Sequence, residues 1–222
     1  MNYRIYIRNT SLIVLASVIS FSSCRREPVL APGTEQVCFD EQVMPIIQSY
    51  CTMSDCHGSG GESLQLLSYD DVKAIIKPGY PNKSKLYNVI TAKGLVLTSM
   101  PPKSKTQLTT QQINLITIWI LQGAEHTTCV PANCDSVNVT YSSTIAPVIE
   151  NYCTGCHSGG NPGGGIVLQD YTTVAAAVAS GRLSGSIKQL PGYSSMPKNG
   201  NKLSDCTIAQ ITKWINDGTP NN

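Results

Sequence analysis

The 222-residue sequence predicts an all-α protein made of two tandem copies of one small helical domain. Apolar residues recur at helical spacing in several segments, which is the pattern of amphipathic helices. A set of short segments occurs twice in the same order, which indicates an internal duplication. The 18 glycines and 13 prolines indicate that much of the remaining chain forms loops between these helices.

The composition argues against a nucleic-acid partner and for an oxidising compartment. Only 14% of the residues are charged and the formal net charge is +2, so neither an acidic nor a basic field is expected. Nine cysteines are unusual for a cytosolic protein of this size, where thiols are kept reduced.

The N-terminus has the features of an export signal. Arg4 and Arg8 precede an apolar run at 11–21 that is too short to span a bilayer. Small residues before Cys24 resemble a bacterial lipobox, so we expect a lipoprotein signal peptide at 1–23 and a lipid-bearing Cys24 that holds the protein to a membrane. An ordinary secretory signal with an incidental cysteine is the alternative. Both predict a periplasmic or cell-surface protein.

The duplication defines the predicted domains. The matching segments are 44–51 with 146–153, 66–69 with 168–171, 99–101 with 195–197, and 108–124 with 203–219. Because the order is kept throughout, we predict a tether at 24–36, a first domain at 37–128 and a second domain at 129–222.

Each copy is predicted to begin and end with a helix. For the last helices, Thr109 and Ser204 are the expected N-caps, and Gly123 and Gly218 are the expected stops. The apolar stripes of the first helices lie within 43–50 and 145–152, and those of the last helices are Ile113, Ile116, Trp119, Ile120 and Ile208, Ile211, Trp214, Ile215. Both tryptophans are therefore expected in the core.

A C-x-x-C-H run occupies 153–157, and this pattern is typical of c-type haem attachment. Two thiols about one helical turn apart can each bond one vinyl group on the same porphyrin edge. We therefore expect Cys153 and Cys156 to hold haem c, and His157 to bind its iron. A dithiol–disulfide pair needs no such histidine, and a structural zinc site needs four ligands.

The first copy carries a longer version of this run, C-x-x-x-x-C-H, at 51–57. The two extra residues must bulge. Because the repeat aligns this run with 153–157, we expect Cys51 and Cys56 to hold a second haem c, with His57 on the iron. The alternative is a copy that has lost its haem and carries a disulfide between its two motif cysteines.

Met100 and Met196 are the expected second axial ligands. Each lies in Ser-Met-Pro before the last helix of its copy, and a thioether ligand raises the potential of haem iron. Methionine as core filler is the alternative. Met44 and Met53 are assigned to packing, and His126, which has no counterpart in the second copy, to a solvated loop.

The order of C-x-x-C-H, Leu-x-x-Tyr, Ser-Met-Pro and a closing W-I-x-x-G helix resembles the class I cytochrome c fold. It is most similar to the small bacterial cytochrome domains named after planctomycetes. This resemblance covers nearly the whole mature chain, twice, and implies two tandem cytochrome c-like domains, each a few helices around one covalently bound haem. The implied ligand sets are Cys153, Cys156, His157, Met196 and Cys51, Cys56, His57, Met100. The sequence departs from the pattern of this family at two places. The first motif is longer, and Lys198 follows Met196-Pro197 where the family more often has a second proline.

Four further cysteines allow three pairings. Because the first and last helices of a cytochrome c fold cross, the resemblance favours Cys38–Cys129 and Cys134–Cys206 over a metal site or reactive thiols. The glycine-rich run 158–165 lacks the Gly-Lys-Ser ending of a phosphate loop and is expected to be a flexible loop.

These features predict an electron carrier, not an enzyme. Its partners would be a membrane complex or dehydrogenase as donor and an oxidase or soluble cytochrome as acceptor. One alternative is a dihaem peroxidase, which needs an iron with an open distal side. The other is a haem-bearing structural module of a larger membrane complex.

Overall fold

The computed structural model describes residues 28–53, 56–61, 64–92, 99–129, 134–198 and 200–222. These residues form helices joined by loops and contain no β-strand, which confirms the all-α prediction for this part of the chain. No helix within these ranges is long and apolar enough to cross a bilayer. The predicted signal peptide, Cys24 and the start of the tether lie outside the described residues.

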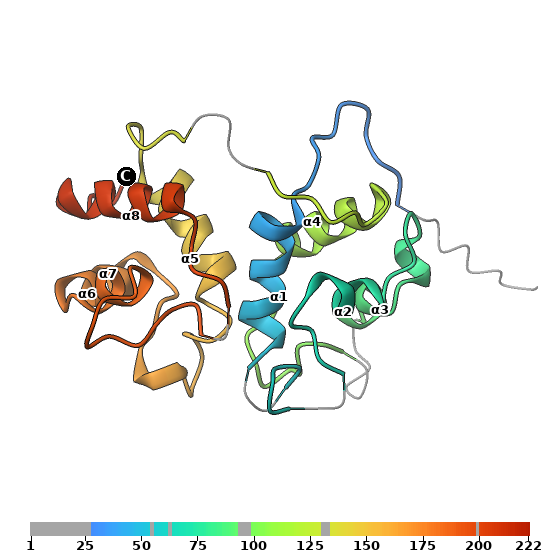
Figure 1. Cartoon of the computed structure of the whole chain (residues 1–222), viewed down its shortest axis with the longest axis horizontal. Coiled ribbons are helices and arrows are strands. Elements are labelled where there is room, and N and C mark those ends of the chain that lie inside the picture. Colours follow the sequence, from blue (N-terminus) through green and yellow to red (C-terminus); the bar gives the residue numbers. More distant parts are fainter. Residues whose placement is uncertain (1–27, 54–55, 62–63, 93–98, 130–133, 199) are drawn as a thin grey trace, which may run out of the picture.

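The helices fall into two halves that lie side by side (Figure 1). The first half, residues 37–129, contains η1 (Phe39–Val43), α1 (Met44–Cys51), α2 (Tyr69–Lys73), η2 (Pro81–Lys83), α3 (Lys85–Ile90) and α4 (Thr110–Leu121). The second half, residues 134–222, contains η3 (Tyr141–Ile145), α5 (Ala146–Tyr152), η4 (Gly163–Gly165), α6 (Tyr171–Ala179), α7 (Arg182–Ile187) and α8 (Asp205–Asn216).

Each half has its own hydrophobic core around one tryptophan. Trp119 of α4 is 1% exposed and Trp214 of α8 is fully buried, as their position in an apolar stripe predicts. In the first half Trp119 packs against Phe39 of η1, and in the second half Trp214 packs against Tyr141 of η3. The last helix of each half therefore packs on the start of its first helix.

The helix ends follow the sequence prediction. Thr109 and Ser204 are the N-caps of α4 and α8, and their hydroxyls accept hydrogen bonds from backbone N–H groups in the first turn. Gly123 and Gly218 follow the C-caps with φ of 101° and 87°, a region that favours glycine. The matching pair Ser68 and Asp170 also proves to cap helices, namely α2 and α6.

Both first helices begin with a feature that the sequence does not reveal. A π-helical turn precedes each of them, at Phe39–Val43 before α1 and at Tyr141–Ile145 before α5. The apolar periodicity of the following residues predicts an α-helix but carries no signal for wider winding, because π-turns are decided by local packing.

Two disulfides close the halves, in the pairing that the resemblance implied. Cys38 bonds to Cys129, and Cys134 bonds to Cys206, with Cα–Cα separations of 5.6 and 5.7 Å. The first links the residue before η1 to the segment after α4. The second links the chain ahead of η3 to the first turn of α8.

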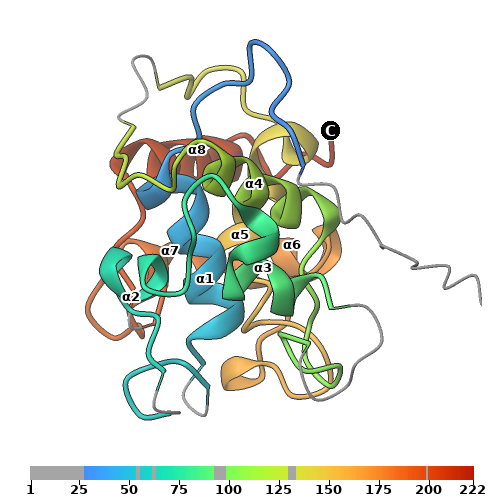
Figure 2. The same cartoon turned by 90° about the vertical axis from the view of Figure 1, so that its right-hand side faces the viewer.

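The halves meet where α1 packs against α5 (Figures 1 and 2). Tyr50 donates a hydrogen bond to the carbonyl of Glu150 (3.1 Å), and Tyr152 donates one to the carbonyl of Glu41 (2.9 Å). These tyrosines are equivalent in the repeat, and each bonds the backbone of the other half, at Glu150 in α5 and at Glu41 in η1. Gln112 of α4 is buried at this junction, and its Nε2 donates a hydrogen bond to Oδ1 of Asn151 in α5 (3.1 Å).

Candidate haem sites

The motif of the second half forms a tight turn at the end of α5. The amides of Cys156 and His157 both donate to the carbonyl of Cys153, at 3.1 and 2.9 Å. Cys153 and Cys156 therefore belong to the same turn, and His157 is its last residue. His157 is 8% exposed, so its imidazole is held inside the second half.

A backbone carbonyl fixes the orientation of the His157 ring. Nδ1 lies 3.2 Å from the carbonyl oxygen of Ile166, and because that oxygen can only accept, Nδ1 must carry the proton. Nε2 is then the nitrogen with a free lone pair, as a metal-binding imidazole requires. The His157 carbonyl in turn accepts from the amide of Leu168, which ties the motif to the segment before α6.

The longer motif of the first half holds its histidine in the same way. The amide of His57 donates to the carbonyl of Cys51 (3.0 Å), and its Nδ1 donates to the carbonyl of Leu64 (2.8 Å). Its own carbonyl accepts from Leu66, the equivalent of Leu168. The predicted bulge at residues 54–55 lies outside the described residues.

The four motif cysteines are free thiols, whereas the other four described cysteines form disulfides. The alternative of a disulfide between Cys51 and Cys56 is therefore not what the structure contains. Burial raises the pKa of Cys51 and of Cys153 to about 12, with a smaller contribution from the neighbouring motif cysteine. Both are protonated thiols at neutral pH.

Both predicted methionine ligands lie in loops anchored to the preceding helix. The amide of Met100 donates to the carbonyl of Val89 in α3 (2.9 Å), and the amide of Met196 donates to the carbonyl of Ser186 in α7 (3.2 Å). Both residues are half-buried. Met44, assigned to packing, lies buried in the core of the first half.

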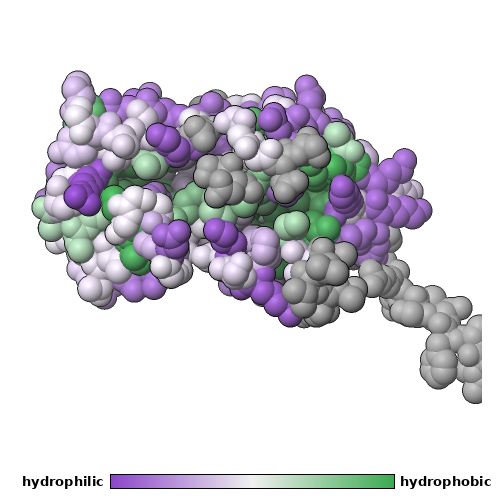
Figure 3. All heavy atoms as spheres, turned by 90° about the horizontal axis from the view of Figure 1, so that it is seen from below, coloured by the Kyte–Doolittle hydropathy of each residue, from purple (hydrophilic) through white to green (hydrophobic). Residues whose placement is uncertain are grey.

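The donor set in each half fits a covalently attached haem. It combines two unpaired thiols, an imidazole with Nε2 free, and a thioether in an anchored loop, and in the second half the two thiols come from one turn. The loops that follow α1 and α5 lie at the lower side of Figure 1. Figure 3, which views this side, shows hydrophobic residues in recesses of both halves, the surroundings that a porphyrin face needs.

The glycine-rich run 158–165 contains local structure that the sequence did not predict. It contains the 3-10 turn η4, and the amide of Gly163 donates to the carbonyl of Cys156 (2.9 Å). Ser158 shares a hydrogen bond of 2.5 Å with Thr106 of the first half. Gly163 also lies against the imidazole of His157, since a Cβ there would come within 3.6 Å of the ring.

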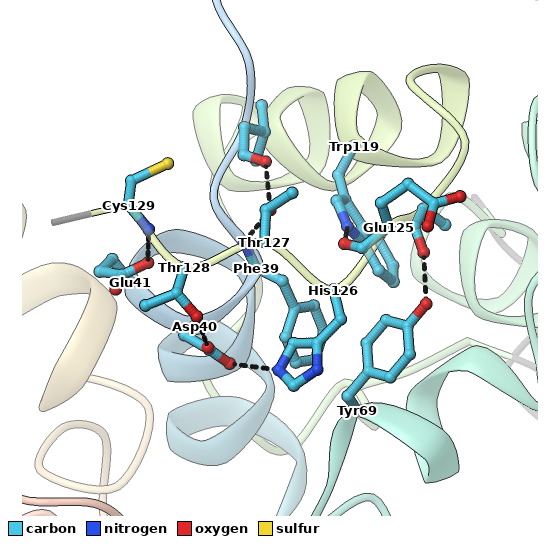
Figure 4. Close-up of polar contacts among 12 residues, drawn as sticks. Phe39, Asp40, Glu41, Tyr69, Trp119, Glu125, His126, Thr127, Thr128 and Cys129 are labelled. Carbon is cyan, nitrogen blue, oxygen red and sulfur yellow. Dashed lines mark hydrogen bonds and ion pairs between the residues drawn. The ribbon is translucent and has the colours of Figure 1, made fainter.

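His126 is held by neighbours that sequence analysis did not anticipate (Figure 4). Its Nε2 lies 3.0 Å from Oδ1 of Asp40, and its ring stacks on Tyr69 with centroids 4.5 Å apart. Thr128 donates to the other carboxylate oxygen of Asp40. The side chain lies in a loop and is 51% exposed, as predicted for His126, and these contacts with Asp40 and Tyr69 are what the sequence did not reveal. The hydrogen bonds of His126 and Thr128 to Asp40 therefore connect the segment after α4 to η1.

The comparison with known families points to a c-type cytochrome domain in the second half of the chain. The family model described as cytochrome C oxidase, cbb3-type, subunit III matches residues 143–215, from η3 to the last turn of α8. This match supports a haem-binding c-type cytochrome that takes part in electron transfer, and it suggests an electron carrier rather than an enzyme. No curated protein and no solved structure gives a match to the chain.

Proposed function

We propose that this chain carries electrons through two haem c groups, one in each half. The observation that supports the first-half site is the hydrogen bond from Nδ1 of His57, which repeats that of His157 although the motif is two residues longer. When bound, haem supplies an iron that gains and loses one electron reversibly.

The residues of each half have separate tasks. The free thiols of Cys153 and Cys156 in the second half, and of Cys51 and Cys56 in the first, would hold the porphyrin by thioether bonds. His157 and His57 would bind the iron through Nε2, because the carbonyl at Nδ1 sets the orientation of each ring.

Met196 and Met100 are the residues that would supply a thioether as second ligand to each iron. Such a ligand would leave no site for a substrate on the iron and would raise its potential relative to two nitrogen ligands. The anchoring of both methionine amides to the preceding helix supports this assignment, because it limits the movement of the loop that carries the sulfur.

The protein is further proposed to work outside the cytoplasm, held to a membrane by lipid on Cys24. Its two disulfides are typical of an oxidising compartment. Its partners there would be a dehydrogenase or membrane complex as donor, and an oxidase or soluble cytochrome as acceptor.

The number of covalent haems tests the proposal directly. A pyridine haemochrome spectrum, combined with protein quantitation, should give two haems per chain in protein exported from cells that attach haem c. Replacing Cys51 and Cys56 by Ala should remove one haem, and replacing Cys153 and Cys156 by Ala should remove the other. A wild-type protein with one haem that survives the first double substitution would overturn the first-half site, and colourless protein would overturn both.

A further inference from the structure

The end of α1 in the first half touches the haem motif of the second half. Ser49 is 4% exposed, and its hydroxyl accepts a hydrogen bond from the amide of Gly155 (3.1 Å). The carbonyl of Ser49 accepts from the thiol of Cys156 (3.2 Å). One residue of the first half therefore bonds two residues inside the C-x-x-C-H turn of the second half. A thioether at Cys156 would have no S–H to donate, so with haem attached the bond from the Gly155 amide is the one that remains.

Only glycine at position 155 permits this approach. A Cβ at Gly155 would lie 2.3 Å from the carbonyl oxygen of Ser49, a backbone atom that cannot move away like a flexible side chain. Glycine is used where two backbones must come this close. The contact is therefore part of the packing of the two halves.

The contact forms a short path between the two attachment sites. Ser49 precedes Cys51 by two residues, so two peptide bonds connect the carbonyl that touches the Cys156 sulfur to the residue proposed to hold the first haem. The end of α1 and the motif of the second half therefore lie against each other.

Several hydrogen bonds around the contact keep it in place. Tyr50 and Tyr152 each bond the backbone of the other half, and Thr106 bonds Ser158 directly after the second motif. Each of these bonds crosses the junction between the halves. The two motifs are consequently held at a fixed separation instead of being joined only by the chain between the halves.

We propose that Ser49 and Gly155 are positioning residues that hold the two haem-attachment segments together, so that an electron passes between the halves within one chain. This inference rests on the proposed function. The step moves one electron: ferrous iron in one half is oxidised, ferric iron in the other is reduced, and no bond forms or breaks. The chain would then connect a donor on one half to an acceptor on the other.

The Gly155→Ala variant tests the contact, with Gly160→Ala as its matched control. Gly160 lies in the following loop, where an added Cβ meets nothing within 4 Å. Flash photoreduction of protein that carries two haems should show an electron-equilibration phase whose rate is independent of protein concentration. We expect this phase to slow several-fold in Gly155→Ala and to be unchanged in Gly160→Ala.

A second readout does not depend on the redox reaction. Amide hydrogen exchange at the end of α1 should be faster in Gly155→Ala than in the wild type, because the added methyl group separates the backbones. If Gly155→Ala does not load both haems, Ser49→Ala serves instead, since it removes the acceptor of the Gly155 amide without adding an atom. It should slow the same phase by a smaller factor.

The outcomes separate this inference from the proposed function. Two haems per chain with no concentration-independent phase, or with the wild-type rate in both Gly155→Ala and Ser49→Ala, would overturn the inference and leave the electron carrier intact. A single haem per chain would overturn the first-half site and the inference together.

Discussion

His57 and His157 each donate from Nδ1 to a carbonyl later in the chain, in Leu64 and Ile166 respectively. Such a bond leaves the opposite nitrogen with its lone pair free for a metal and increases the basicity of that nitrogen. The loops that supply these carbonyls differ in sequence, but both lead to a leucine whose amide bonds the histidine carbonyl. Both imidazoles are therefore held by the same set of backbone hydrogen bonds, although the residues in the two loops differ.

The role of Met196 leads to a spectroscopic prediction. Met196→Ala should leave the haem of the second half with one open axial position, so a high-spin component should appear in the optical spectrum and the midpoint potential should fall. Met44→Leu is the control, because Met44 packs in the core of the first half and its replacement should leave the spectrum unchanged. An unchanged low-spin spectrum in Met196→Ala would contradict the assignment.

Tyr152 leads to a prediction about alkaline pH. Burial raises its pKa from 10.0 to about 12, so the folded protein keeps the proton that the unfolded chain loses above pH 10. The free energy of unfolding should therefore fall by about 1 kcal/mol per pH unit between pH 10 and 12 from this group alone.

Urea unfolding at about pH 9 and about pH 11 measures this effect. Tyr152→Phe should be less stable at the lower pH, because it loses the hydrogen bond to Glu41, but it should show a shallower decline with pH. Tyr80→Phe is the control, since Tyr80 is exposed. Equal slopes in wild type and Tyr152→Phe would count against the buried, protonated hydroxyl.

At the scale of elements, α4 combines a capping role with a contact between the halves. The Oε1 of Gln112 accepts from the amide of Thr109 (2.9 Å), and the Thr109 hydroxyl accepts from the amide of Gln112 (3.3 Å). The Nε2 of Gln112 also donates to Oδ1 of Asn151 in α5 (3.1 Å). The start of α4 is therefore fixed both by its own cap and by the second half.

The cap leads to a prediction about stability. Thr109→Ala should lower the free energy of unfolding by about 1 kcal/mol, because an amide in the first turn loses its acceptor. Thr110→Ala, one residue later on an exposed site, should change it by less than about 0.5 kcal/mol. Thermal or urea unfolding measures both, and equal effects would show that the Thr109 hydroxyl does not act as a cap.

At the scale of the whole molecule, two small cores are made stable by cross-links and by each other. Each half alone buries a limited apolar area, so a disulfide and a packed neighbour contribute a large share of its stability. Cys38–Cys129 spans 91 residues and Cys134–Cys206 spans 72 residues. Because the stabilisation depends only weakly on loop length, both should contribute similarly.

Removal of one disulfide measures this contribution. Replacing Cys38 and Cys129 together by Ala should lower the free energy of unfolding by about 4 kcal/mol in the chain-entropy description. The double replacement of Cys134 and Cys206 should have an effect of the same size. A loss well below this in either variant would indicate that the unfolded chain is already compact.

Much of this structure could be predicted because the repeat shows each signal twice. The caps at Thr109 and Ser204, the stops at Gly123 and Gly218, and the buried tryptophans all depend on local sequence and spacing. The pairing of the disulfides needed the resemblance to a known fold, because four cysteines alone leave three possibilities. The C-x-x-C-H pattern predicted the haem chemistry without any structure.

By itself, the sequence determined the helical periodicity, the helix ends and the residue types for haem attachment, because these depend on neighbours a few positions away. Only the tertiary structure decided how His126 binds Asp40, how Gln112 reaches α5, and that Ser49 touches the second motif. These contacts join residues far apart in the chain, and no local pattern marks them. The contacts of Gln112 and Ser49 exist because the two cores pack together, and at Gly155 the absence of a side chain lets two backbones meet.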